Sequence, residues 1–292
     1  MLSGKLKESA EKGLAESLNK PVSIISSSSI SGGCINHAVK IKTTLGEYFL
    51  KHNNASLYPH MFSAEEKGLR LLRDADEIFI PMPICSGEDG TDSFLILDFV
   101  QAGIRKKDFW EAFGISLARL HQHTADKFGL DHNNYIGSLP QSNKQNLSWV
   151  DFFICERLEP QIKKAKLGKG MHEKFTRLFG LLPNIFPKEP PALLHGDLWN
   201  GNYMVGEDGK PVIIDPAVYY GHREMDVGMT MLFGGFDKMF YDSYNQECPL
   251  EQGWESRLDI CNLYPLLVHV NLFGGGYIGQ VNSILDRFAV VG

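Results

Sequence analysis

The stretch HGDLWNGN at residues 195–202, followed by YMV at 203–205 and VII at 212–214, decides the fold of this chain. The two short apolar segments are joined by EDGK at 207–210, which is a typical hairpin turn. Asp215 stands directly after the second segment. The sequence therefore predicts a polar loop, then a small antiparallel hairpin, and a carboxylate at the end of that hairpin.

The polar residues of this stretch have the spacing that phosphoryl transfer requires. That reaction needs a carboxylate beside the attacking hydroxyl and oxygen ligands for the metal ions that bridge the phosphates. Asp197 is predicted to orient the hydroxyl and accept its proton, while Asn202 and Asp215 are predicted to bind Mg²⁺, which prefers oxygen donors. The alternative is an Asx-rich turn that only caps the local backbone. Spacing, residue types and flanking strands favour an ATP- and Mg²⁺-dependent small-molecule kinase.

A lysine in the first third of the chain supplies a second part of such a site. Lys51 ends the predicted strand EYFLK at 47–51. A lysine placed there can contact the α- and β-phosphates of ATP if a glutamate holds it in position. Glu65 and Glu66, on a helix predicted over residues 64–73, are the two available partners.

Helical periodicity separates these two glutamates. Glu65 shares a face with Leu69, so it is predicted to point inward, whereas Glu66 shares a face with Arg70 and is predicted to point to solvent. Glu66 also follows Ser63 by three positions, which predicts a capping box at the start of the helix. We therefore assign Glu65 to Lys51.

A glycine-containing loop is a third candidate element. The stretch SISGGCIN at 29–36 is neither a dinucleotide-binding nor a Walker motif, and an ordinary hairpin turn is the alternative. Gly32 and Gly33 would let backbone N–H groups approach phosphates closely. Cys34 would then be an exposed thiol beside phosphate-binding donors, either a redox-sensitive cysteine or a quiet surface one.

The composition excludes several other classes of protein. The chain has 292 residues, is 43% hydrophobic, and carries a net charge of −6, which argues against a nucleic-acid or polybasic membrane partner. Its five cysteines are widely spaced, so we expect reduced thiols in a cytoplasmic protein. The apolar run at 263–273 is too short to span a bilayer. His121 and His123 flank Gln122 on a predicted helix and do not share a face, which argues against a metal site.

The secondary-structure pattern changes near residue 100. Strands are predicted at 22–25, 38–43 and 94–97 in addition to 47–51, and helical spacing dominates from Phe109 onward. We therefore expect an α+β fold of two lobes: an antiparallel sheet with one helix in residues 1–98, and a mainly helical lobe in residues 99–292. Asp98 to Gly103 would be the connector.

Several motifs spread along the chain resemble those of the fructosamine kinase (ketosamine-3-kinase) family. They are GGCIN at 32–36, Lys51, MFSAE at 61–65, WVDFF at 149–153, HGDLWNGN at 195–202, DPAVYYGHREMD at 215–226 and NLFGGGY at 271–277. The resemblance implies a protein-kinase-like, aminoglycoside-phosphotransferase-like fold. It departs from protein kinases where Pro-Ala follows Asp215, and this implies that there is no regulated activation loop.

The resemblance agrees with the roles given to Lys51, Glu65, Asp197, Asn202 and Asp215, and it adds others. It implies that Trp199, Glu224 and Asp226 lie on the substrate side or support the loop. It also implies that adenine bonds to the connector backbone near Asp98 and Val100.

The reaction implied by the resemblance is phosphorylation of the O3 hydroxyl of a ketosamine, the rearranged adduct of a sugar with an amine. The phosphate is then eliminated from C3 and the amine is freed, which amounts to deglycation. Ribulosamines and erythrulosamines are expected to be preferred over fructosamines. The substrate would be a small ketosamine or a glycated protein, and the enzyme a monomer or a redox-dependent homodimer. The rivals are a kinase of another small alcohol or amine, such as an aminoglycoside or choline, and a pseudokinase that binds nucleotide without turnover.

Overall fold

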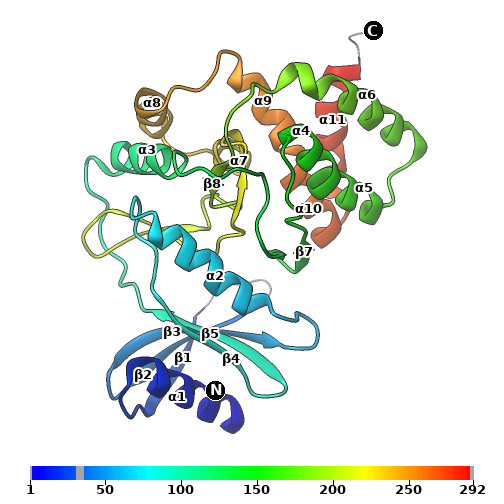
Figure 1. Cartoon of the computed structure of the whole chain (residues 1–292). Helices are drawn as coiled ribbons and strands as arrows, with labels where there is room; N and C mark the ends of the chain where they lie inside the picture. The colour runs from blue at the N-terminus through cyan, green and yellow to red at the C-terminus, as the bar shows by residue number, and fades with distance from the viewer. Residues whose placement is uncertain (1, 31–35, 290–292) are drawn as a thin grey trace. The chain divides into compact units, whose positions relative to one another are not determined.

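The computed structural model describes residues 2–30 and 36–289, and Gly32, Gly33 and Cys34 therefore lie outside the described residues (Figure 1). The chain forms two compact units: residues 1–109 with 203–216, and residues 110–202 with 217–292. This division differs from the expected contiguous lobes 1–98 and 99–292 because it assigns the connector and the 203–216 segment to the first unit.

A five-stranded antiparallel sheet forms the centre of the first unit. Its strands are β1 (Ile24–Ile30), β2 (His37–Thr43), β3 (Gly46–Asn54), β4 (Pro83–Glu88) and β5 (Asp92–Asp98). They lie in the order β1-β2-β3-β5-β4, so β3 is central and β1 and β4 are the edges. Central placement of β3 fixes Lys51 between Ala38 of β2 and Leu95 of β5.

Two strands differ from the sequence-based expectation. The serine run 26–29 lies beyond the strand predicted at 22–25, but it belongs to β1 and pairs with β2. No strand was predicted between residues 51 and 94, but Pro83 begins β4 in that interval. Proline lacks an N–H donor and is tolerated at the first residue of an edge strand, and β4 is such a strand.

Helices α1 (Gly4–Leu18) and α2 (Met61–Asp74) cover opposite faces of this sheet (Figure 1). Apolar residues at a spacing of four give α1 a buried face, which packs on the sheet, chiefly against β4 and β5. That shared core consists of Leu6, Ala10, Leu14, Val22, Ile24, Val39, Ile41, Tyr48, Leu50, Cys85, Phe94 and Ile96.

Helix α2 begins earlier than the capping box predicted. Its N-cap is His60 in the left-handed conformation, with no side-chain capping bond. Ser63 lies inside the first turn, where its hydroxyl donates to the carbonyl of His60. Glu66 instead pairs with Arg70, one turn further on, at 2.7 Å. The capping-box prediction is therefore wrong. Glu66 does not pair with Lys51, as predicted, but it does not point to solvent either, because it also accepts a hydrogen bond from the Ser86 hydroxyl at 2.6 Å.

The hairpin of β9 (Tyr203–Val205) and β10 (Pro211–Ile213) confirms the predicted ribbon and belongs to the first unit. The N–H of Gly103 donates to Val205 at 3.0 Å, and a Cβ on Gly103 would stand only 2.1 Å from the carbonyl oxygen of Gly206. Glycine is required at residue 103 for this close approach. The contact ties the hairpin, and with it Asp215, to the connector.

The second unit is mainly helical, with short paired strands between the helices. Its helices are α3 (Phe109–Leu120), α4 (Trp149–Phe152), η1 (Phe153–Leu158), α5 (Glu159–Ala165), α6 (Lys169–Ile185), α7 (Glu224–Leu232), α8 (Lys238–Glu247), α9 (Trp254–Cys261), α10 (Leu263–Phe273), η2 (Gly275–Tyr277) and α11 (Ile278–Ala289). Its strands are β6 (Asn134–Ile136), β7 (Leu139–Gln141), β8 (Ala192–Leu194) and β11 (Tyr219–Gly221). One apolar core joins most of these elements, including Phe152, Leu182, Tyr219 and Leu267.

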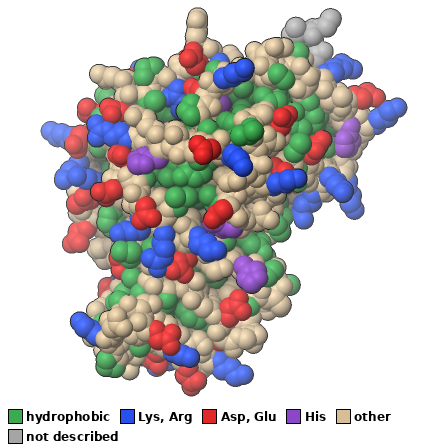
Figure 2. All heavy atoms as spheres, viewed as in Figure 1, with side chains coloured by type: hydrophobic (Ala, Val, Ile, Leu, Met, Phe, Trp, Pro, Cys, Tyr) green, Lys and Arg blue, Asp and Glu red, His purple; other side chains and the backbone are tan. Residues whose placement is uncertain are grey.

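The surface and the helix lengths give two simple findings. Basic and acidic side chains are interspersed on the face drawn in Figure 2. Across the residues that the structure describes, no helix has both the length and the apolarity needed to cross a bilayer.

Matched isoleucines test the core of the first unit. Ile41 is fully buried under α1, whereas Ile25, on β1, is 63% exposed. Ile41→Ala is expected to lower the free energy of unfolding by about 2–5 kcal/mol, because it leaves a cavity. Ile25→Ala should change it by less than about 0.5 kcal/mol. Urea unfolding of both variants measures the difference, and equal effects would contradict this packing.

Candidate functional site

Lys51 lies between two carboxylates in the first unit. Its Nζ is 2.6 Å from Glu65 Oε1 and 2.5 Å from Asp215 Oδ1, and its side chain is almost completely buried. Burial by itself lowers the pKa of Lys51, but the charges of Asp215 and Glu65 outweigh that effect and raise the pKa above its ordinary value. Lys51 is therefore a permanently charged cation, and the predicted pairing with Glu65 is present.

Asp215 has an unusual backbone at the end of the hairpin. Its φ is +55°, a left-handed conformation that a non-glycine residue adopts at a cost of about 1–3 kcal/mol. Asparagine and aspartate tolerate this region best. The side chain is half exposed while one carboxylate oxygen contacts Lys51. The fold thus holds the Asp215 side chain on a strained backbone, and strained residues are common at functional sites.

The catalytic-loop candidate follows β8 in the second unit. Asn202 is buried, and its Nδ2 donates to both the backbone oxygen of Asp197 at 2.8 Å and the carboxylate Oδ2 of Asp197 at 2.9 Å. The N–H of Asp197 donates to Nδ1 of His195 at 3.2 Å. The five-residue spacing seen in the sequence therefore closes a small ring that fixes the direction of the Asp197 carboxylate.

Gly196 is the point of closest backbone approach in this loop. Its φ is +82°, and a Cβ there would stand 2.1 Å from the carbonyl oxygen of Ala217. The N–H of Ala217 donates to the carbonyl of His195 at 2.8 Å. Only glycine satisfies both conditions, which explains the middle residue of the HGD motif.

Asp226 lies beneath the loop on the first turn of α7. Its Oδ2 accepts from the N–H of His195 at 2.7 Å and its Oδ1 accepts from the N–H of Gly196 at 2.8 Å. Nε2 of His121 is 3.2 Å from Oδ2, and Nδ1 of His121 is 2.7 Å from the hydroxyl of Tyr244. Burial raises the pKa of Asp226, but the bond and charge of His121 and the backbone donors bring it below its ordinary value. The resemblance implied that Asp226 lies on the substrate side or supports the loop, and these hydrogen bonds fit the second alternative.

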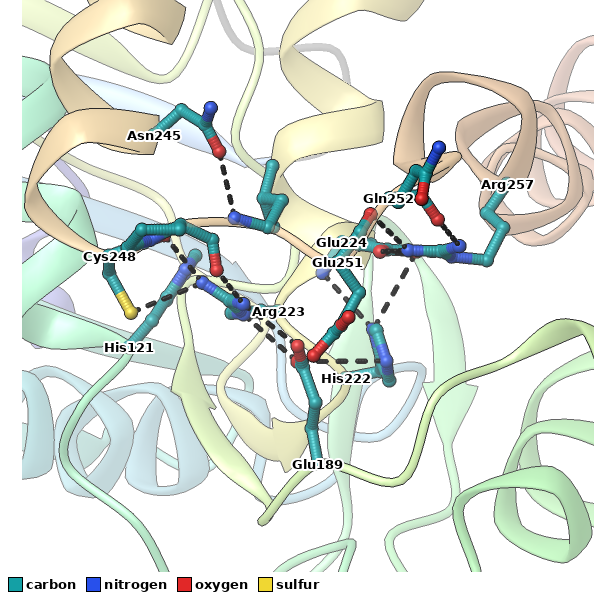
Figure 3. Close-up of polar contacts among 12 residues, drawn as sticks. His121, Glu189, His222, Arg223, Glu224, Asn245, Cys248, Glu251, Gln252 and Arg257 are labelled. Carbon is teal, nitrogen blue, oxygen red and sulfur yellow. Dashed lines mark hydrogen bonds and ion pairs between the residues drawn. The ribbon is translucent and has the colours of Figure 1, made fainter.

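Glu224 lies in a buried ion pair. It is completely inaccessible, and Nη2 of Arg257 is 2.6 Å from its Oε1 (Figure 3). Arg257 also donates to the carbonyls of Glu251 and Gln252, in the chain segment before α9. This position does not support direct contact of Glu224 with a substrate, and that role stays a prediction.

A second buried pair lies next to it. Arg223 holds both carboxylate oxygens of Glu189, at 2.9 and 2.8 Å, and donates to the carbonyls of Cys248 and Pro249 (Figure 3). His222 lies between the two pairs, with Nε2 3.7 Å from Glu189. The arginines thus anchor the segment between α8 and α9 to the chain that enters α7.

Trp199 is partly exposed two residues after Asp197. Its ring lies edge-on to that of Phe233, with the ring centres 5.8 Å apart, and the ring centres of Phe233 and His269 are 4.7 Å apart. Phe273 and Tyr277 complete this aromatic group around His269, at 5.4 and 5.1 Å. The structure therefore places Trp199 at the accessible edge of an aromatic surface beside the loop.

The predicted adenine-binding residues lie at the end of β5. The N–H of Asp98 donates to Met82 at 2.9 Å, so a backbone bond to adenine from this residue would come from its carbonyl. Val100 follows in the connector, outside any regular element. Their role in nucleotide binding stays a prediction.

Sequence reasoning did not find His121 or Arg257. Both lie far along the chain from their acidic partners, 105 and 33 residues away. Short motifs carry no signal for such pairs. The only hint was that buried carboxylates in the 215–226 motif require a cationic or hydrogen-bonding partner.

These features define a protein-kinase-like phosphotransferase: a lysine–glutamate pair, an aspartate after a hairpin and an Asp–Asn catalytic loop. The aminoglycoside phosphotransferase APH(4)-Ia shares the fold, with a TM-score of 0.63 at 14% identity over 98% of this chain and 99% of that one. The predicted α+β kinase-like fold, with an antiparallel sheet and a mainly helical part, is confirmed.

The chain belongs to the fructosamine kinase family, whose model matches residues 6–290. It is 39% identical to a probable ketoamine kinase of Synechocystis over 94% of both chains. It is also 39% identical to the chloroplastic protein-ribulosamine 3-kinase of Oryza sativa subsp. indica, over 92% of this chain and 80% of that protein. A solved putative fructosamine-3-kinase from Haemophilus somnus aligns with a TM-score of 0.87 at 30% identity, covering 96% and 97% of the two chains. Membership of this kinase family implies the use of ATP.

Alanine at residue 196 tests the geometry of the loop. Gly196→Ala is expected to destabilise the fold and to abolish phosphoryl transfer, because the new Cβ collides with the carbonyl of Ala217. Gly180→Ala, on an open face of α6, is the control and should stabilise by about 0.5–1 kcal/mol. Thermal unfolding and turnover measure both, and a fully active Gly196→Ala enzyme would refute this view of the loop.

The buried imidazole of His222 predicts a loss of stability in acid. Burial lowers the pKa of His222 to about 4, with the neighbouring arginines adding to the effect and Glu189 opposing it. The unfolded imidazole binds its proton near pH 6.5, so stability falls as the pH drops from about 6.5 toward 4, by on the order of 3 kcal/mol. Denaturation at several pH values should show a shallower loss for His222→Asn. The exposed His172→Asn control should follow the wild type.

Proposed function

We propose that this chain transfers the γ-phosphate of ATP to the O3 hydroxyl of a ketosamine. The family assignment and the names of relatives, ketoamine kinase and protein-ribulosamine 3-kinase, support the substrate class. The observation that carries the kinase chemistry is the shared ion pair of Lys51 with Glu65 and Asp215. Such a lysine binds α- and β-phosphates in kinases of this fold.

Lys51, Asp215 and Asn202 would bind the phosphates of ATP and the metal ion. Lys51, permanently charged and held by Glu65, would bind phosphate oxygens. Asp215 and the amide oxygen of Asn202 would hold Mg²⁺, and both are the oxygen donors that this ion prefers. The donor set fits, because Asp215 is a half-exposed carboxylate and the Nδ2 of Asn202 is already fixed on Asp197. Bound Mg²⁺ would neutralise charge that develops on the transferring phosphoryl group.

The acceptor side falls to Asp197. Its carboxylate is held by Asn202 and lies on a loop whose backbone is fixed by Asp226. It would accept the proton of the O3 hydroxyl while that oxygen bonds to the γ-phosphorus and the bond from this phosphorus to the β,γ-bridging oxygen breaks, which releases ADP. A positioned base of this kind contributes about 10²–10⁴-fold in rate.

Trp199 and its aromatic neighbours support a substrate-side role for this edge of the loop. An aromatic face attracts a nearby cation. The amine nitrogen of a ketosamine is basic, so its protonated form would be held at Trp199 while O3 approaches Asp197. The preference for ribulosamines over fructosamines stays a prediction, as does action on free or protein-bound substrates.

A substrate panel tests the proposal. Purified protein with ATP and Mg²⁺ is expected to phosphorylate ribuloselysine and erythruloselysine faster than fructoselysine, and to leave choline and aminoglycosides unchanged. Release of inorganic phosphate during later incubation would support phosphorylation at O3. Equal rates on fructosamine and ribulosamine would contradict the preference, and no consumption of ATP with any ketosamine would contradict the function.

The base is tested by a single change. Asp197→Asn is expected to lower kcat by about 10²–10⁴-fold while ATP affinity, measured by calorimetry, stays similar, because the nucleotide contacts are elsewhere. Asp126→Asn, at an exposed position, is the control and should keep wild-type turnover. Full activity in Asp197→Asn would remove the assigned role.

A further inference from the structure

An unusual helical turn precedes Pro160 in the second unit. Residues Phe153–Leu158 form a π-helix between α4 and α5. Proline at residue 160 cannot donate to the carbonyl of Glu156, four residues back. Nη1 of Arg157 donates to that carbonyl at 3.1 Å instead. Turns of this kind are rare and are often found at functional sites.

Arg157 is fully buried in a largely aromatic environment. Its guanidinium lies 4.0 Å from the ring centre of Tyr219, 4.6 Å from that of Phe152 and 5.5 Å from that of Tyr264. It donates to the carbonyl of Ser142 at 2.5 Å and to Oδ1 of Asn143 at 2.7 Å. In the part of the chain that the structure describes, none of the ion pairs involves Arg157. A buried cation without a carboxylate is expensive, so its position calls for an explanation.

Tyr219 connects this cation to the catalytic loop. It pairs with Leu194 across the β8–β11 ladder, and Leu194 directly precedes His195. Cε1 of Tyr219 is 3.3 Å from the point where a Cβ of Gly196 would stand. The ring that stacks on Arg157 therefore also packs behind Gly196, one residue from Asp197.

Amide side chains hold the same strand segment from its other side. Nε2 of Gln141 donates to the carbonyl of Ala217 at 3.1 Å, and Nδ2 of Asn134 donates to that of Val218 at 2.8 Å. The hydroxyl of Tyr264 donates to Oε1 of Gln141 at 2.7 Å. Burial raises the pKa of Tyr264, and its phenol feels the opposite charges of Arg157 and Asp197. Arg157 and the loop therefore belong to one buried network.

We infer that Arg157 is a positioning residue for phosphoryl transfer, which acts through Tyr219 to hold the backbone of the loop that carries Asp197. The inference rests on the proposed kinase function. A planar guanidinium can stack flat on Tyr219 while it donates to two acceptors from its edge, whereas a lysine ammonium has no planar face to stack. The positioning role therefore requires arginine and not merely a positive charge.

Three variants test the inference. Arg157→Met removes the charge but keeps a long side chain, and Arg157→Lys keeps the charge but removes the planar guanidinium. Leu182→Ala is the control, because it removes buried volume from the same core, at α6. Both Arg157 variants are expected to lower kcat by about 10²-fold, since small misplacement of a catalytic group has that effect. The KM for ATP should change by less than about threefold. Leu182→Ala should lower Tm without a comparable fall in kcat. A kcat near wild type in Arg157→Met, or full rescue by lysine, would overturn the inference.

Hydrogen exchange separates this inference from the proposed function. The N–H groups of His195 and Gly196, which bond to Asp226, should exchange faster in Arg157→Met than in wild type and Leu182→Ala. This measurement needs no substrate, so it decides the positioning role even if the wild type phosphorylates no ketosamine. Unchanged exchange would overturn the inference. If Arg157→Met does not fold, Tyr219→Leu removes the same stack, and it must show both the lower kcat and the faster exchange.

Discussion

The second unit depends on the hydrogen bonds that the buried carboxylate of Asp226 accepts. This carboxylate is almost completely buried, and such a charge is tolerated only when its lone pairs are satisfied. Two of the donors are the backbone N–H groups of His195 and Gly196, so the requirements of the buried charge determine the path of the loop. The direction of Asp197 then follows, because Asn202 closes the loop onto it. The geometry of the 195–202 loop is thus a consequence of satisfying one buried anion.

Other buried charges around this point are paired in different ways. Arg223 donates to both carboxylate oxygens of Glu189, and Arg257 donates to both of Glu224. His222 lies between the two pairs, and burial lowers its pKa so that it remains neutral. Arg157 is different, because aromatic faces and carbonyls replace a carboxylate. Each of these pairings joins segments that are distant in sequence.

In the first unit, one cation serves two anions. Lys51 is shared by Glu65 from α2 and Asp215 from the hairpin, and the charges of these two carboxylates keep it charged although burial opposes this. When nucleotide binds, its phosphates would compete with the two carboxylates for Lys51. Mg²⁺ would compete with Lys51 for Asp215. The ion pair therefore holds the three side chains close together.

The sequence by itself determined the local parts. Residue spacing identified the Asp197–Asn202 loop, the hairpin before Asp215 and the inward face of Glu65, because helix and strand periods and short loops are encoded by neighbouring residues. Tertiary structure decided the rest. It set the start of α2, the edge strand that begins at Pro83, the buried partners of Asp226 and the stack of Arg157 on Tyr219. These depend on contacts between residues far apart in the chain, whose energies arise only when folding removes them from water.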